Sequence, residues 1–78
     1  MKYTKRITQY IIKVGHQYYH WNRRLEKMTL VNDIEYAHIY GSYEEAKQDI
    51  DIMVEHGNYK NKKKTILKAE FSYEEVEQ

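Results

Sequence analysis

The chain has 78 residues, and 13 Lys and Arg side chains nearly balance 12 Asp and Glu, which leaves a formal net charge of +1. This length predicts a single domain over residues 1–78, because domains usually take about 100–200 residues, and it excludes large multi-substrate enzymes. The absence of cysteine excludes disulfides, thiolate metal sites and cysteine-based catalysis. The core must therefore rest on apolar burial or on self-association.

The first fifteen residues contain no apolar run of signal-peptide length, because Thr8, Gln9 and Tyr10 interrupt it. No stretch elsewhere approaches the roughly 20 apolar residues that span a bilayer. We therefore expect a cytoplasmic protein without membrane contact.

Two segments rich in β-branched and aromatic residues, Arg6–Val14 and Gln17–Asn22, predict a pair of strands. Gly15 and His16 between them fit a two-residue hairpin turn with glycine at its first central position. Continuous pairing from this turn places one set of residues on the core face: Tyr10, Ile12, Val14, Tyr19 and Trp21. The opposite face then carries Ile11, Lys13, Tyr18 and His20.

The middle of the chain is less regular. Residues 22–27 are polar and predict a turn. Residues 28–31 either continue the sheet or lead into a one-turn helix capped by Asp33. The apolar stretch Ala37–Tyr40 predicts a brief third strand that ends at Gly41.

The clearest local signal is a capping box formed by Ser42 and Glu45, in which Glu45 is expected to reach back to the Ser42 amide. Apolar residues at helical spacing follow, and Gly57 fits a left-handed stop. The sequence therefore predicts an amphipathic helix over Tyr43–His56.

A last strand is predicted from Thr65 to Tyr73, where apolar and polar residues alternate. We expect an α+β fold, in which a small antiparallel sheet (hairpin, short strand and final strand) carries one amphipathic helix on one face. The predicted core consists of Tyr10, Ile12, Trp21, Ala46, Ile50, Met53, Leu67 and Phe71. With Leu67 inward, Ile66 would lie on the uncovered face.

Charge is segregated along the chain, although the total is balanced. Residues 1–27 carry seven basic side chains and one acidic, and residues 28–57 carry one basic and seven acidic. A basic loop with an aromatic residue follows, a combination that binds phosphates while a ring stacks on a base. This loop is the candidate site for an alternative function in nucleic-acid binding during recombination or replication. Its members are Tyr59, Lys60, Lys62, Lys63 and Lys64. A solvated loop explains the same residues, and no recognition motif accompanies them.

Catalytic and metal sites are not predicted. His16 and His20 are four residues apart, but in a hairpin this spacing does not form a compact metal site, and no HExxH or Cys/His cluster supports them. Most carboxylates belong to a solvated helix or to the last residues, where acid–base catalysis lacks a pocket. We therefore expect a non-enzymatic protein without cofactor or metal.

Nine tyrosines in 78 residues are too many for so small a core, so some must be exposed. Tyrosine is favoured in binding surfaces because it offers a large amphipathic area at low entropic cost. The uncovered sheet face and the acidic helix form the predicted protein-binding surface: Ile11, Tyr18, His20, Ile66, Glu44, Asp51 and Glu55. Strand propensity alone, or a homodimer contact, would account for the same aromatic patch.

The segment Tyr10–Trp21, then Asp33–Tyr40, then the helix start Ser42–Ala46 resemble a family of short, uncharacterised early-region proteins of temperate phages of Gram-positive bacteria. The resemblance spans nearly the whole chain and is one of layout. It implies an accessory role in which a small protein binds a host or satellite-element protein stoichiometrically. The binding would inhibit that protein or, where the target is a repressor, relieve repression, as an antirepressor does. The expected partner is a DNA-binding repressor or replication factor.

Overall fold

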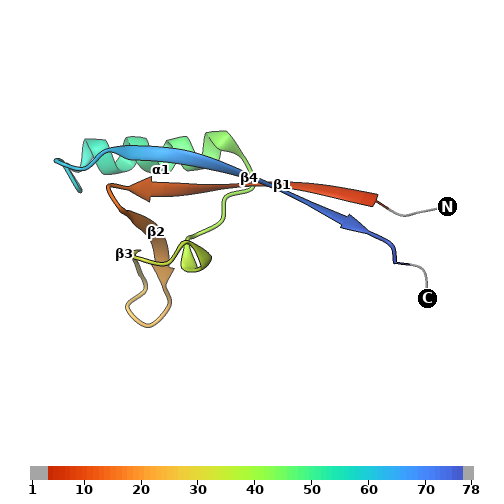
Figure 1. Ribbon diagram of the computed structural model, residues 1–78. Coiled ribbons are helices and arrows are strands. Elements are labelled where there is room, and N and C mark those ends of the chain that lie inside the picture. Colours follow the sequence, from red (N-terminus) through yellow and green to blue (C-terminus); the bar gives the residue numbers. More distant parts are fainter. Residues whose placement is uncertain (1–3, 77–78) are drawn as a thin grey trace.

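The computed structural model describes residues 4–76, which form a four-stranded antiparallel sheet in the order β3-β2-β1-β4 (Figure 1). One helix covers one face of this sheet, which confirms the predicted α+β class. The elements are β1 (Thr4–Val14), β2 (Gln17–Asn22), β3 (Lys27–Val31), the 3₁₀ turn η1 (Ile34–Tyr36), α1 (Tyr43–Glu55) and β4 (Lys64–Glu74).

The turn between β1 and β2 follows the prediction. Gly15 has φ +63°, and Val14 pairs with Gln17 and Lys13 with Tyr18. The further pairs expected from continuous counting, such as Tyr10 with Trp21, do not form, because β2 diverges from β1 after two pairs.

The segment that follows η1 fills the gap between these diverging strands. The Tyr40 N–H donates to the Tyr10 carbonyl at 2.8 Å, and the Tyr10 N–H donates to the Tyr40 carbonyl at 3.0 Å. The His38 N–H donates to the Tyr19 carbonyl on β2 at 2.8 Å. The predicted strand over 37–40 is therefore a single bridge, which satisfies backbone groups that β1 and β2 no longer offer each other.

Helix α1 begins and ends at the predicted signals. The Ser42 Oγ accepts the Glu45 N–H at 3.2 Å, while Glu45 Oε2 accepts the Gly41 N–H at 3.2 Å rather than that of Ser42. At the other end Gly57 has φ +70°, and the Asn58 N–H donates to the carbonyl of Met53 at 2.8 Å. This is a Schellman stop, which requires a left-handed residue after the helix.

We expect Gly57→Ala to lower the free energy of unfolding by about 1 kcal/mol, because alanine is strained at positive φ. No atom lies within 4 Å of the added methyl group, so the cost comes from the backbone alone. Urea denaturation measures it, with Gly41→Ala as the control because Gly41 has no positive φ. Equal unfolding midpoints for the two variants would contradict this account of the helix end.

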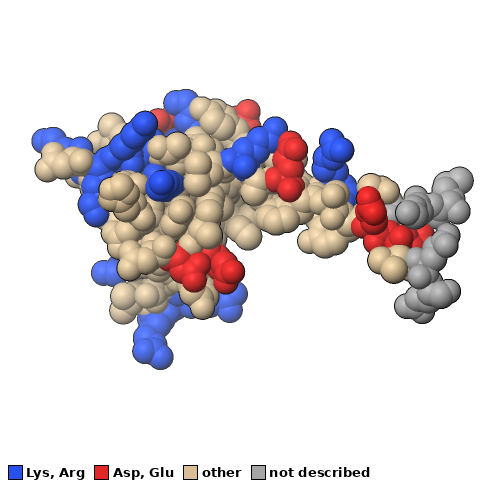
Figure 2. All heavy atoms as spheres, viewed as in Figure 1, with Lys and Arg blue, Asp and Glu red and all other residues tan. Residues whose placement is uncertain are grey.

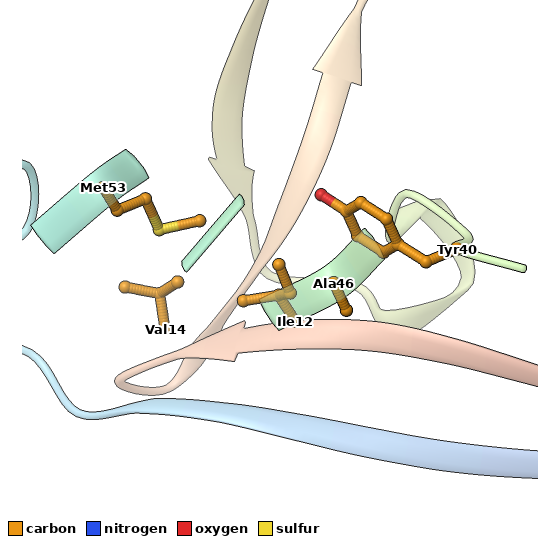
Figure 3. Packing of buried hydrophobic residues seen from close by; sticks show 5 residues of the cluster. All are labelled: Ile12, Val14, Tyr40, Ala46 and Met53. Atoms are coloured by element: carbon orange, nitrogen blue, oxygen red, sulfur yellow. The ribbon is translucent and has the colours of Figure 1, made fainter. Parts of the chain in front are cut away.

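The core lies between α1 and the end of β1 nearest the hairpin (Figure 3). It consists of Ile12, Val14, Tyr40, Ala46 and Met53. Ile66 packs against it from β4, where it pairs with Ile12. Three predicted core residues were placed wrongly. Trp21 is 43% exposed because β2 diverges from β1 before it reaches this residue. The register of β4 against β1 places Leu67 and Phe71 on the face away from α1.

Strands β1 and β4 pair along their whole length, from Val14 with Lys64 to Thr4 with Glu74. Beyond the Tyr10–Tyr40 bridge, β1 has no neighbour in the described sheet except β4. Residues 4–9 and 69–74 therefore form a two-stranded arm that projects from the body of the molecule, whose longest dimension is 52 Å (Figure 1).

Candidate protein-interaction site

A series of apolar residues in β4 lies on the sheet face turned away from α1. Strand residues alternate between faces, and Ile12 and Val14 point to the helix, so their odd-numbered neighbours point away. In β4 the same face carries Leu67 opposite Ile11 and Phe71 opposite Ile7. We call this surface the open face, and its members on β1 and β4 are Lys5, Ile7, Gln9, Ile11, Lys13, Thr65, Leu67, Ala69, Phe71 and Tyr73.

A groove of about 280 Å³ lies where the open face meets the segment around η1. Its only polar members are Gln9 and Glu35. The other residues that line it are Ile11, Ile34, Ala37, Ile39, Ala69 and Phe71. Ile34, Ile39 and Phe71 are each about half exposed, at 49%, 53% and 48%. The groove is therefore an apolar surface in contact with water, a feature typical of a docking site.

Local hydrogen bonds hold the η1 side of the groove. Both structures considered for the middle of the chain occur, since β3 is followed by a one-turn helix capped by Asp33. The Asp33 Oδ1 accepts the Glu35 N–H at 2.9 Å, and the Tyr36 N–H donates to the Asp33 carbonyl at 3.1 Å. The His20 Nδ1 lies 2.6 Å from the Tyr36 carbonyl and ties η1 to β2. Ile34 is thereby fixed at the rim.

The predicted site residues divide between the two sides of the sheet. Ile11 lies on the open face, as expected, and it also lines the groove, which was not predicted. Tyr18 pairs with both Lys13 and Val31, and His20 contacts η1, so these two residues lie beside the groove rather than in it. The placement of Ile66 was wrong, because the β4 register sets it against the core beneath α1.

The acidic residues proposed for the same surface, Glu44, Asp51 and Glu55, are exposed on α1 and therefore belong to the opposite side of the sheet. Asp51 forms an ion pair with Lys47 at 3.7 Å, one helical turn away. A small partner on the open face would not contact these carboxylates. The single surface predicted from the sequence is thus two separate surfaces.

The lysine loop is partly engaged in its own structure. Lys64 Nζ donates to the Tyr59 carbonyl at 2.9 Å, and Lys62 Nζ donates to Gln17 Oε1 at 3.4 Å. The Tyr59 ring makes an edge-to-face contact with Tyr19, with centroids 6.4 Å apart, and packs against the core. Lys60, Lys62 and Lys63 are exposed. Figure 2 shows Lys and Arg gathered at this end of the molecule and at the β2–β3 turn.

A second, shallower hollow of about 390 Å³ was not predicted. It is lined by His20, Trp21, Arg23, Tyr36, Ala37, His38 and Ile39. It forms because β2 turns away from β1 and exposes Trp21, a divergence that the alternation of β2 does not reveal. Within residues 4–76 no three or more His, Asp or Glu side chains come together as metal ligands would.

A partly buried hydrogen bond joins the sheet side of the core to α1. The Tyr40 hydroxyl donates to Asp49 Oδ2 at 2.6 Å, and Tyr40 is only 5% exposed. Burial and then this hydrogen bond raise the pKa of the Tyr40 phenol far above its ordinary value. Burial, followed by the nearby Tyr59 and Asp49, also raises the pKa of Tyr19. Tyr40 belongs to the core cluster beneath α1, and Tyr19 packs against it.

Comparison with known proteins finds no matching family model, no similar curated sequence and no similar solved structure. In the described part of the chain, no helix has the length and apolar character needed to cross a membrane.

Proposed function

We propose that the protein is a non-enzymatic accessory protein of the temperate-phage type, which acts by binding another protein stoichiometrically through the open face. The observation that carries the proposal is the groove, where Ile34, Ile39 and Phe71 are about half exposed around an apolar floor. Burying such a surface against a partner is favourable by about 25 cal/mol per Å² of apolar area.

The proposed partner is a DNA-binding protein of the host or of a mobile element, such as a repressor or a replication factor, in the bacterial cytoplasm. Its basic surface would be attracted by the carboxylates of α1, of which Glu44, Asp51 and Glu55 are exposed. Since these lie on the far side of the sheet, their role would be to steer the encounter, while the groove provides the contact. The partner would lose access to its DNA or to its own dimer interface.

We expect Ile34→Asp to weaken partner binding about tenfold or more, because a charge at the groove rim would have to be buried on docking. The matched control is Ile52→Asp, which makes the same change at a 45% exposed isoleucine on α1. Immobilised protein would retain the partner from a bacterial host lysate. The parent chain and Ile52→Asp should retain it, and Ile34→Asp should lose it.

A titration of the retained partner's binding to its DNA then tests the mechanism. Inhibition that is complete near an equimolar ratio agrees with stoichiometric binding. Time-dependent inhibition by far less than one equivalent would indicate an enzyme instead. Retention of the same protein by Ile34→Asp and by the parent chain would show that the groove is not the site.

Nucleic-acid binding by the lysine loop is the competing outcome. It would show as direct binding to a bare oligonucleotide that falls steeply with salt through counterion release. Such binding would be lost when Lys60, Lys62 and Lys63, the exposed lysines of the loop, are replaced by glutamine. The Ile34→Asp variant would bind the oligonucleotide as the parent does.

A further inference from the structure

The outer edge of β4 is an unpaired strand edge. In β1, Tyr10 uses its N–H and carbonyl toward Tyr40, on the side away from β4, so odd-numbered residues of β1 face β4. Their partners in β4 are odd-numbered as well. The even-numbered residues from Lys64 to Glu74 therefore direct their backbone N–H and C=O groups outward. Among residues 4–76, no strand pairs with this edge.

The sequence of β4 is complementary to itself when read in the opposite direction about Ala69. One step from this centre stand Lys68 and Glu70, and five steps away stand Lys64 and Glu74. Two steps away stand Leu67 and Phe71, both on the open face. An antiparallel pair of β4 strands centred on Ala69 would thus set lysine against glutamate and leucine against phenylalanine, pairings that stabilise neighbouring strands.

Backbone geometry permits this register, and charge favours it over the adjacent ones. The centred pairing matches even-numbered residues with even-numbered residues, and these are the ones whose backbone groups point outward. A shift by two residues in one direction places Lys68 opposite its own copy, and a shift in the other places Glu70 opposite its own copy. Like charges directly opposite each other destabilise strand pairing.

The exposed two-stranded arm is a second reason to expect this pairing. A two-stranded ribbon is marginally stable in water on its own, and here residues 69–74 extend beyond the body with β1 as their only neighbouring strand. In the centred register, residues 70–74 of each copy lie along residues 64–68 of the other. Each arm would then be flanked by the body of the second copy.

We infer that the protein forms a symmetric homodimer in which the outer edges of the two β4 strands pair antiparallel about Ala69. The two four-stranded sheets become one continuous sheet of eight strands. The contact is isologous, as closed dimers require. The edge pairing leaves the open face of each sheet uncovered, so each copy keeps its groove. The dimer is therefore independent of the proposed partner binding.

Charge reversal at the edge tests the dimer. In the proposed dimer, residue 68 of each copy faces residue 70 of the other. In the Lys68→Glu variant both of these contacts join two glutamates, and in the Glu70→Lys variant both join two lysines. We expect the dissociation constant of each variant's homodimer to rise about tenfold or more. An equimolar mixture of the two should form a heterodimer, because opposite charges again face each other. Lys60→Glu, which reverses a charge on an exposed loop residue away from the β4 edge, is the matched control.

Sedimentation velocity over a concentration series measures the association, and circular dichroism checks that each variant folds. The Lys68–Glu70 ion pair within one chain is 3.2 Å long and more than half exposed, so its loss has little effect on the fold. The double variant Lys68→Glu/Glu70→Lys keeps that pair and should dimerise like the parent. A parent chain that sediments only as a monomer, or single variants that dimerise as the parent does, would overturn the inference.

Discussion

Replacing Ile12 by alanine is expected to lower the free energy of unfolding by about 2–5 kcal/mol, the range for large-to-small changes in a packed core. Ile12 is completely buried, and it lies in the cluster that joins β1 to Ala46 and Met53 of α1 (Figure 3). The cluster has few members, so few neighbouring side chains can move into the cavity that the shorter alanine leaves. Since domains are stable by about 5–15 kcal/mol, a large fraction of the variant should be unfolded at mildly raised temperature.

Urea or thermal denaturation followed by circular dichroism measures this loss. Ile11→Ala is the matched control, because it makes the same change one residue away on the open face, where the side chain is only partly buried. Trp21→Ala should also cost less than Ile12→Ala, since Trp21 is 43% exposed. If Ile11→Ala were the more damaging of the two isoleucine variants, the assignment of the sheet faces would be wrong.

The second large effect is expected from Tyr40→Phe, which removes the 2.6 Å hydrogen bond to Asp49 and nothing else. Hydrogen bonds to charged groups contribute about 1.5–3 kcal/mol, so the variant should lose a stability of that order at neutral pH. The phenol also makes the parent chain sensitive to alkali. Its pKa is raised in the folded state, so the unfolded chain gives up this proton first.

The sign of the pH dependence follows from that order of proton loss. The stability contributed by the neutral phenol is fully present below the ordinary tyrosine value of 10.0 and falls as the pH rises above it. Tyr40→Phe should therefore lose less stability between pH 9 and pH 11 than the parent, as urea denaturation at each pH would show. Tyr36→Phe, at a 62% exposed tyrosine, should keep the parent's slope. Equal slopes for parent and Tyr40→Phe would contradict the role of this phenol.

Local signals were sufficient to predict α1 and the first turn. The cap at Ser42 and the stop at Gly57 depend on residues within a few positions of each other, and both were found where expected. The divergence of β2 could not be predicted in this way. It depends on Tyr40, which pairs with Tyr10, thirty residues earlier in the chain, in the place where β2 was expected. The alternation of residues within β2 contains no sign of this distant pairing.

The error in β4 has a different cause. Ile66 and Leu67 are adjacent apolar residues, so alternation allows either to face inward. The apolar series that begins at Leu67 is the longer one, and it therefore predicts the core face. In the structure the helix covers Ile66, and the longer series faces outward. The apolar pattern that was expected to build the core builds the candidate binding surface instead, and a single sequence does not separate these two uses.

The pairing of β1 with β4 also sets the order of events during folding. Val14 and Lys64 are separated by 50 positions and Thr4 and Glu74 by 70, so the longest ladder in the sheet joins the two ends of the described chain. Contacts between residues so distant in sequence form slowly, because the chain must close a large loop before any of them contributes energy. On the ribosome, β1 emerges before β4 and stays without its main partner until β4 has been synthesised. Folding is therefore expected to be completed only after translation of β4, and the hairpin and α1, whose contacts are local, are the segments able to form earlier.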